Sequence, residues 1–413
     1  MRISHAILGV FIAWLGFSAA SPFSPHPLGS LKQAFFEGWF LRIVDHEKQI
    51  SLVVIISSYR RAGADSEDLE HYCSLGYQKP PNGDEKGQRI QTWHVFREDD
   101  KGGPTIPPSP PDRISDPDFT WAADGVGSVT ISGDVGQIDM VVEELSISAN
   151  FSTRVPWSKD QPNNYGPEGW LGQTDLLPLR YFIHSFGSDV TYTVTPAGSL
   201  PISGRGLMHI EANYGRACFP KGWVWAEGMD STQGLNGGTF VNGKNIEDGE
   251  TKMKTGGIKF IMTGGKFIIG PITTNSFVIG YRSPLHDWDF RNTDLDCIKS
   301  SWSHAEHRLN VTASSFLGRR VIKASVQAAE GSFGDRFYMP GPEGWTNLPG
   351  ATESHNATAT FHLYERRLPF MKLVLVEEAV VTMSVLEFGG EFVDPSHLHG
   401  RCEVEIEPTG DLP

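Results

Sequence analysis

The chain has 413 residues, with 35 Lys and Arg against 49 Asp and Glu, and its formal net charge at pH 7 is -14. This surplus of negative charge repels phosphate backbones and anionic membrane surfaces, so we expect no nucleic-acid partner. The 45 glycines and 27 prolines leave little room for long helices.

The first 20 residues have the pattern of a cleaved signal peptide. Arg2 precedes an apolar run over residues 6–17, and residues 18–20 are Ser-Ala-Ala, the small residues that a signal peptidase reads. The run is shorter than the ~20 apolar residues that span a bilayer, and no later segment is long enough. We therefore expect a secreted or lumenal protein without stable membrane insertion.

Three Asn-X-Ser/Thr sequons agree with this compartment, and they predict glycosylation at Asn150, Asn310 and Asn356. Four cysteines remain after cleavage: Cys73, Cys218, Cys297 and Cys402. An oxidising compartment permits disulfides among them, and the sequence does not distinguish the three pairings that four cysteines allow. No Cys-x-x-Cys spacing occurs, which argues against a zinc site or a redox motif.

Short runs of β-branched and aromatic residues recur between turn signals. They predict strands at residues 50–57, 127–131, 137–147, 191–195, 257–261, 266–269, 276–281, 358–364 and 379–386. No apolar stripe with helical period extends over ten residues. We therefore expect an all-β protein of the sandwich or barrel type with little helix.

One internal repeat indicates two related halves. Gly-Pro-Glu-Gly-Trp occurs at residues 166–170 and again at 341–345, as expected if each half carries an equivalent loop. A chance coincidence of common turn residues is the alternative. Glycines and Pro201 cluster at residues 198–206, so we divide the mature chain into residues 21–200 and 201–413.

The first segment that suggests chemistry covers residues 35–40. Strand alternation places Phe35, Glu37 and Trp39 on one face and leaves Phe36, Gly38 and Phe40 on the other. A carboxylate between two aromatic rings is unusual for a core face. The alternative is an ordinary edge strand with Glu37 in water.

The second segment covers residues 209–229. Alternation gathers His209, Glu211 and Asn213 on one strand face, and gathers Lys221, Trp223, Trp225 and Glu227 on one face of the strand after the Pro220 turn. Tryptophans flanked by charged residues are typical of an aromatic-walled site for a small molecule, and indole faces stabilise cations. The alternative is that the tryptophans pack the core.

Three groups of residues resemble the tocopherol cyclase family and follow its order. They are Phe-Phe-Glu-Gly-Trp-Phe at residues 35–40, then Glu211-x-Asn213-Tyr214-Gly215 with Phe219-Pro220 and Trp223-x-Trp225, and last Tyr364-Glu365-Arg366 with Glu387-x-Gly389-Gly390. The resemblance implies two lipocalin-like β-barrel halves around a hydrophobic site. It also implies ring closure, in which an acid protonates a prenyl double bond and a phenol oxygen captures the tertiary cation.

The resemblance implies these site residues: Glu37, Glu211 and Asn213 as catalytic groups, with Trp39, Tyr214, Trp223 and Trp225 as the wall. Two departures from the family pattern matter. Tyr214 stands where the family usually has tryptophan, and Glu227 stands where an amide is common. Glu227 therefore becomes another candidate acid, and Lys221 another candidate for substrate binding.

The signal peptide departs from the plastid or cyanobacterial location of that family. The architecture is also similar to that of fungal lipocalin-like pericyclases, which catalyse [4+2] cycloadditions. We therefore expect a cyclase that forms a pyran or chroman ring on a hydrophobic meroterpenoid or related metabolite, by protonation or by hetero-Diels-Alder cycloaddition. The alternatives are a non-catalytic carrier of a terpenoid, lipid or pigment, and a structural protein with a vestigial site.

Other site classes have weaker signals. His304 and His307, and His397 and His399, are short histidine pairs of the kind that is more often solvated than bound to metal, so we expect no metal. No dinucleotide fingerprint, phosphate loop or Gly-x-Ser-x-Gly motif occurs. We therefore expect no cofactor and no serine hydrolase.

Overall fold

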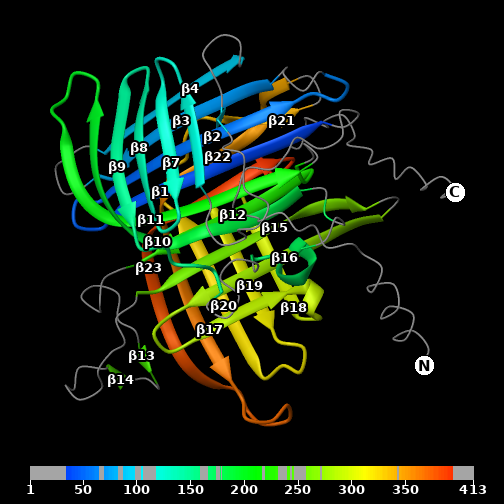
Figure 1. Ribbon diagram of the computed structural model, residues 1–413. Helices are drawn as coiled ribbons and strands as arrows, with labels where there is room; N and C mark the ends of the chain where they lie inside the picture. Colours follow the sequence, from blue (N-terminus) through cyan, green and yellow to red (C-terminus); the bar gives the residue numbers. More distant parts are fainter. Residues whose placement is uncertain are drawn as a thin grey trace, which may run out of the picture.

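The computed structural model describes residues 34–64, 69–81, 87–97, 104–105, 118–158, 166–173, 177, 179–215, 219–230, 240–241, 244–245, 257–269, 272–341 and 344–393. These residues form two antiparallel sheets and two short 3₁₀ helices, η1 (Gly169–Gln173) and η2 (Asn292–Asp294) (Figure 1). The expected all-β fold of two barrel-like halves is confirmed. The predicted signal peptide lies outside the described residues, and neither described helix is long or apolar enough to cross a membrane.

The first sheet has the order β4-β3-β2-β1-β11-β10-β9-β8-β7-β6-β5. Its strands are β1 (Phe35–Asp45), β2 (Ile50–Arg60), β3 (Leu69–Lys79), β4 (Gln88–Arg97), β5 (Pro104–Thr105), β6 (Asp118–Ala123), β7 (Gly127–Ser132), β8 (Val135–Val142), β9 (Leu145–Ser152), β10 (Leu179–Pro196) and β11 (Ile202–Gly215).

The second sheet has the order β17-β16-β15-β12-β23-β22-β20-β19-β18; off this path, β13 pairs with β14 and β23, and β21 pairs with β22. Its strands are β12 (Gly222–Met229), β13 (Phe240–Val241), β14 (Lys244–Asn245), β15 (Lys259–Ile269), β16 (Ile272–Arg282), β17 (Asp287–Arg291), β18 (Cys297–Ser303), β19 (Arg308–Ser314), β20 (Arg320–Ala328), β21 (Phe337–Gly341), β22 (Gly344–Glu365) and β23 (Val374–Gly390).

The two sheets repeat one topology. In each, the first strand lies between the last strand and the next strand on the main path of the sheet: β1 between β2 and β11, and β12 between β15 and β23. The first Gly-Pro-Glu-Gly-Trp copy runs into η1 ahead of the penultimate strand β10, whereas the second extends from the end of β21 into the start of the penultimate strand β22. The chain changes sheets after Gly215, whereas the predicted boundary at residue 200 falls between β10 and β11.

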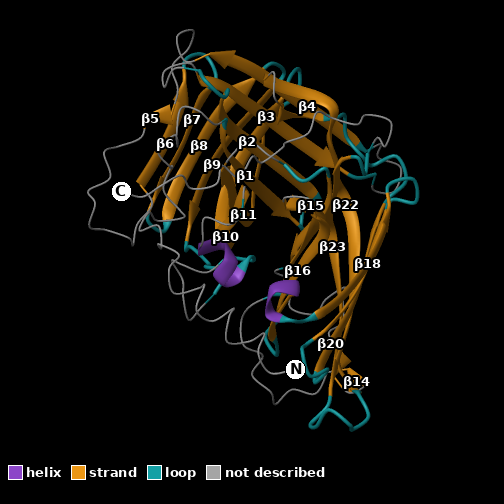
Figure 2. Ribbon diagram, turned by 90° about the vertical axis from the view of Figure 1, so that its right-hand side faces the viewer, coloured by secondary structure: helices purple, strands orange, loops and turns teal. Residues whose placement is uncertain are grey.

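Each sheet has its own apolar core, and a third cluster joins them. Trp39 and Trp121 belong to the core of the first sheet, and Phe260 belongs to that of the second. The third cluster, which includes Ile183 and Trp225, lies between the sheets. Figure 2 shows η1 and η2 close together at one side of this boundary.

Two of the four cysteines lie within the described residues. Cys73 is buried in β3 of the first sheet, whereas Cys297 is exposed in β18 of the second, and no disulfide joins them to each other. Cys218 and Cys402 lie outside the described residues. The two pairings that join Cys73 and Cys297 to these cysteines therefore stay predictions.

Candidate functional site

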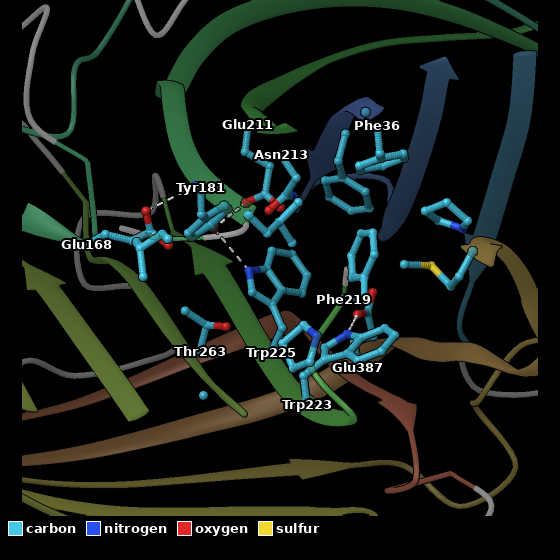
Figure 3. A pocket seen from close by; sticks show the side chains of 18 of the residues that line it. Phe36, Glu168, Tyr181, Glu211, Asn213, Phe219, Trp223, Trp225, Thr263 and Glu387 are labelled. Carbon is cyan, nitrogen blue, oxygen red and sulfur yellow. Dashed lines mark hydrogen bonds between the residues drawn. The ribbon is translucent and has the colours of Figure 1, made fainter. Parts of the chain in front are cut away.

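A cavity of about 440 Å³ lies between the two sheets. Strands β1 and β11 supply one wall, with Phe36 and Glu211, and β12 and β23 supply the other, with Trp225 and Glu387 (Figure 3). The helices η1 and η2 contribute Leu171 and Thr293. The size is in the range of pockets that hold a whole small molecule. Its aromatic lining consists of Phe36, Trp39, Phe40, Tyr72, Tyr181, Phe219, Trp223, Trp225, Phe337, Tyr338 and Trp345.

Rings from separate strands form one continuous aromatic wall. The ring of Phe36 meets Trp345 at 6.0 Å and Phe219 at 5.1 Å, both edge-to-face. Phe219 in turn meets Trp223 at 5.4 Å between ring centroids. Such ring pairs favour a fixed arrangement over a loosely packed apolar pocket.

Strand β1 alternates as predicted, but its cavity-facing side is the opposite one. Phe36, Gly38 and Phe40 line the cavity. Trp39 borders it, yet its ring stacks on Phe119 at 4.8 Å in the core of the first sheet. Glu37 is buried, with 8% of its surface exposed, and it does not line the cavity. The large indole of Trp39 occupies the interior of the curled sheet. Phe36, Gly38 and Phe40 lie on the opposite face of the strand and therefore face the second sheet.

Strand β11 presents Glu211 and Asn213 to the cavity, as the alternation predicted. Tyr181 of β10 donates its hydroxyl hydrogen to Oε2 of Glu211, and Trp225 of β12 donates its indole hydrogen to the Tyr181 oxygen over 3.1 Å. Nε2 of His209 also lies 2.7 Å from Glu211 Oε2. Two side chains of the first sheet therefore contact the carboxyl directly, and Trp225 of the second sheet positions one of them, Tyr181 (Figure 3).

Glu211 and His209 are both neutral near pH 7. Burial raises the pKa of Glu211 to about 8, with a smaller contribution from the charge of Glu353, while the hydrogen bond from Tyr181 opposes the shift. Burial lowers the pKa of His209 to about 4. We assign the hydrogen of His209 to Nε2, because Nδ1 is buried without a hydrogen-bond partner in the described structure.

With two donors directed at Oε2, the proton of Glu211 belongs on Oε1. Glu211 lines the cavity, so this arrangement provides a carboxylic acid that can donate into an apolar space. A carboxyl that stays protonated at neutral pH is the property that general-acid chemistry requires.

Two more carboxyl groups line the same cavity. Burial raises the pKa of Glu168, which follows β9 and precedes η1, to about 8. Burial also raises the pKa of Glu387 in β23 well above its usual range, and the charge of Glu353 adds to this. The indole N–H of Trp223 donates to Glu387. The cavity therefore holds three carboxyls that burial biases toward the neutral form.

Three further predicted site residues lie outside the cavity lining. Glu227 is fully buried and pairs with Arg42, with 2.6 Å between its Oε2 and the arginine Nη1. Tyr214 faces away, its ring stacked on Phe182 at 5.4 Å. Lys221 is exposed at the start of β12. Trp223 and Trp225 of that strand do line the cavity, as predicted.

Sequence reasoning did not identify Glu168, Tyr181 or Glu387 as site residues. Glu168 is the glutamate of the first Gly-Pro-Glu-Gly-Trp copy, so the repeat carried a signal for it. Glu387 belongs to the last group of residues that resembles the tocopherol cyclases. Tyr181 has no distinguishing pattern, because its role depends on contacts with residues 30 and 44 positions away.

The remaining predicted residues are the three glycosylation sequons and the two histidine pairs. Asn150 is exposed in β9, whereas Asn310 and Asn356 are half-buried, and glycosylation stays a prediction for all three. His304 and His307 pack against Phe333. Among the described residues no group of three His, Cys, Asp or Glu side chains could hold a metal, and His397 and His399 lie outside them.

No protein-family model and no curated protein sequence matches the chain. Three solved structures with similar chain paths are CghA with Sch210972, kievitone hydratase from Nectria haematococca, and an AttH candidate from Nitrosomonas europaea. CghA has 8% identity and a TM-score of 0.48, with 91% of this chain and 96% of that one covered. The hydratase has 10% identity and a TM-score of 0.45, with 92% and 95% covered. The AttH candidate has 10% identity and a TM-score of 0.46, with 91% and 97% covered.

Likenesses of this size assign no family and no activity to this chain. The resemblance to tocopherol cyclases therefore stays a prediction, and the function must be argued from the cavity.

Proposed function

We propose that this chain is a secretory-pathway cyclase that closes a pyran or chroman ring on a hydrophobic meroterpenoid or related metabolite. The observation that carries the proposal is the Glu211 carboxyl, which reaches an aromatic-lined cavity with its pKa raised to about 8. A cavity that only binds an apolar ligand has no need for a buried acid supported by a tyrosine and a histidine. Such an arrangement supports proton donation.

The proposed reaction is redox-neutral. Glu211 gives its proton to one carbon of a prenyl double bond, so a C–H bond forms while the π bond breaks and leaves a tertiary cation. A phenol oxygen of the same substrate attacks the cation and closes the C–O bond. The phenol proton returns to the Glu211 carboxylate, which restores the acid.

The surroundings of Glu211 match this charge development. The indole rings of Trp223 and Trp225 line the same cavity, and aromatic faces stabilise a nearby cation. Tyr181 and His209 donate to the Glu211 carboxylate that forms when the proton leaves, and donors fixed in advance lower the barrier for developing charge.

A cycloaddition would form the same ring by another route. An o-quinone methide and an alkene held together in the cavity gain roughly 7 to 11 kcal/mol from proximity alone. Glu211 would then donate a hydrogen bond to the quinone-methide oxygen and keep its proton. The two routes differ in whether a solvent hydrogen enters the product.

The test uses an ortho-prenylated hydroquinone with wild-type protein and Glu211→Gln in D₂O. Protonation predicts that wild-type protein yields a product with one carbon-bound deuterium, and that Glu211→Gln binds the probe normally but turns it over roughly a hundredfold or more slowly. Glu143→Gln, on an exposed turn, is the control and should behave as wild type.

The cycloaddition route is tested with a generated o-quinone methide. It predicts product without carbon-bound deuterium and a loss within roughly tenfold for Glu211→Gln, because the amide can still donate. Binding without conversion of either probe by wild-type protein, together with an unchanged metabolite profile when the gene is deleted, would favour the carrier of a terpenoid, lipid or pigment. Wild-type turnover by Glu211→Gln in both assays would refute the proposed role of the acid.

A further inference from the structure

Exposed apolar side chains concentrate at one end of the second sheet. Of the thirteen exposed large hydrophobic residues in the described structure, five belong to the β19–β20 and β22–β23 loops and a sixth is the first residue of β23. We name residues 315–320 and 366–374 the apolar tip, and its exposed members are Phe316, Leu317, Leu368, Phe370, Met371 and Val374. Phe370 is 84% exposed and Phe316 is 65% exposed. These two loops project at the lower end of the molecule in Figure 1.

Hydrogen bonds fix the two loops against each other. The Arg366 guanidinium donates to the Gly318 carbonyl over 2.5 Å, and the Arg366 backbone N–H donates to the Arg319 carbonyl over 2.9 Å. The Phe316 backbone N–H donates to Asp296 over 3.0 Å. The apolar side chains are therefore presented to solvent on a defined backbone, although apolar side chains of this size normally gain by packing inward.

The charge of the tip is opposite to that of the whole chain. Residues 315–320 and 366–374 contain five basic residues and no acidic residue, whereas the chain has a formal net charge of -14. Arg319, Arg320, Arg367 and Lys372 are exposed. Because charges are screened beyond about 8 Å at physiological ionic strength, a surface that meets the tip senses these basic groups more than the distant acidic ones.

We propose that the apolar tip docks on the surface of an anionic lipid bilayer. Exposed aromatic and aliphatic residues enter the boundary between headgroups and acyl chains, and flanking arginines and lysines bind anionic headgroups. Neither contribution needs a membrane-spanning segment, so docking is peripheral and agrees with the expected lack of stable insertion. The expected repulsion from anionic membranes holds for the chain's net charge and not for this surface.

The tip lies next to one rim of the cavity. Asn292 and Thr293 of η2 line the cavity, and Asp296, which follows η2, accepts the hydrogen bond from Phe316. Leu295 between them is 68% exposed. A docked tip therefore brings the η2 side of the cavity toward the bilayer, from which an apolar ligand would enter.

Flotation with phosphatidylcholine vesicles, with and without phosphatidylserine, tests the proposal on the full chain. We expect the protein to float with phosphatidylserine vesicles, and expect roughly fivefold less bound protein without that lipid or in high salt. The double variant Phe316→Ser/Phe370→Ser should lose roughly tenfold in binding, and so should Arg367→Glu/Lys372→Glu. The control is Leu200→Ser, because Leu200 is 86% exposed but lies on the β10–β11 turn of the first sheet, and it should bind as wild type.

The variants should keep the wild-type melting temperature, because their side chains are already in solvent. Wild-type protein that stays unbound on phosphatidylserine vesicles would overturn the proposal. Equal loss in Leu200→Ser would also overturn it, since binding would not be specific to the tip. A dimer in analytical ultracentrifugation that Phe316→Ser/Phe370→Ser abolishes, without vesicle binding, would instead assign the tip to a contact between two copies.

Discussion

Trp225 and Tyr181 join the two sheets through a single hydrogen bond, with 3.1 Å between the indole nitrogen and the phenol oxygen. Trp225 belongs to β12 of the second sheet, and Tyr181 belongs to β10 of the first. Because Tyr181 also donates to Glu211, the orientation of the candidate acid depends on how the sheets pack together. The acid is therefore a property of the assembled molecule and not of one half.

A double-mutant cycle measures this link. We expect Trp225→Phe and Tyr181→Phe to be non-additive by about 1 kcal/mol in the free energy of unfolding, the usual value of one hydrogen bond. The measurement is urea unfolding of both single variants and the double variant. Trp121→Phe combined with Tyr181→Phe is the control, because Trp121 lies in the core of the first sheet. That pair should add within about 0.5 kcal/mol.

The neutral carboxyls predict a stability that falls as the pH rises from about 4.5 to about 8. Burial raises the pKa values of Glu211 and Glu168 to about 8, from an ordinary value of 4.5, so the folded protein binds more protons than the unfolded chain between these values. Stability is then complete below the lower pKa and is lost as the pH rises through the higher one. The contribution of these carboxyls to the free energy of unfolding should therefore fall between about pH 4.5 and about pH 8 and change little above that range.

The range from pH 6.5 to about 8 separates the carboxyls from the buried histidines, which act below it and in the opposite direction. Burial lowers the pKa of His71 and His209 to about 4 and that of His184 to about 3, so their contribution is lost as the pH falls below 6.5. Glu211→Gln should make the decline between pH 6.5 and about 8 shallower, and cyclisation by wild-type protein should fall as the pH rises through about 8 and Glu211 ionises. A decline that is identical in Glu211→Gln would place the responsible group elsewhere.

Most strands could be predicted from the sequence, and the errors have local causes. Gly264 and Gly265 are typical of a turn, so the sequence predicts separate strands at residues 257–261 and 266–269. In the structure a single strand, β15, covers residues 259–269. A Cβ on Gly264 would lie 1.9 Å from the ring of Phe277, so this glycine permits close packing within a strand. Conversely, residues 137–147 are two strands, since the chain turns at Glu143 with a φ of 50°.

The candidate site was predictable only in part. Alternation correctly grouped Glu211 with Asn213 and Trp223 with Trp225, because a period of two is fixed by strand geometry alone. Which face of β1 meets the cavity depends on how the sheet curls. The curl of the first sheet places Trp39 in its core. Contacts between distant strands, such as that of Tyr181 with Glu211, leave no periodic pattern in the sequence.

The buried pair of Arg42 and Glu227 gives a prediction about stability. Both side chains are 0% exposed, and the Glu227 Oε1 atom has no hydrogen-bond partner in the described structure. The ion pair with Arg42 is therefore the main interaction that offsets the cost of burying the Glu227 carboxylate. We expect Arg42→Met to reduce the free energy of unfolding by about 3–5 kcal/mol, because an unpaired buried carboxylate remains.

Urea unfolding of the single and double variants checks this expectation. Arg42→Met/Glu227→Gln should recover much of the loss, because the double variant buries no charge. The control is the exposed pair Arg308 and Glu306, with side chains 46% and 59% exposed. Arg308→Met should cost less than about 1 kcal/mol. If Arg42→Met is equally mild, the buried pair does not hold the sheets together.

The contact between Gly389 and Trp223 determines the shape of the cavity wall. The two residues are cross-strand partners on β23 and β12, and a Cβ on Gly389 would lie 2.0 Å from the indole ring. Only a glycine therefore lets the ring lie flat against β23, where its N–H donates to Glu387.

Gly389→Ala should displace the ring, break that hydrogen bond and cost about 1–3 kcal/mol of stability. Tryptophan fluorescence should shift, and the affinity for the prenylated hydroquinone should fall roughly tenfold, because the aromatic wall loses its fit. Gly76→Ala is the matched control, since a Cβ there would lie 3.4 Å from Val53, an ordinary contact distance. Wild-type affinity and fluorescence in Gly389→Ala would mean that the indole does not rest on this glycine and that the wall has another arrangement.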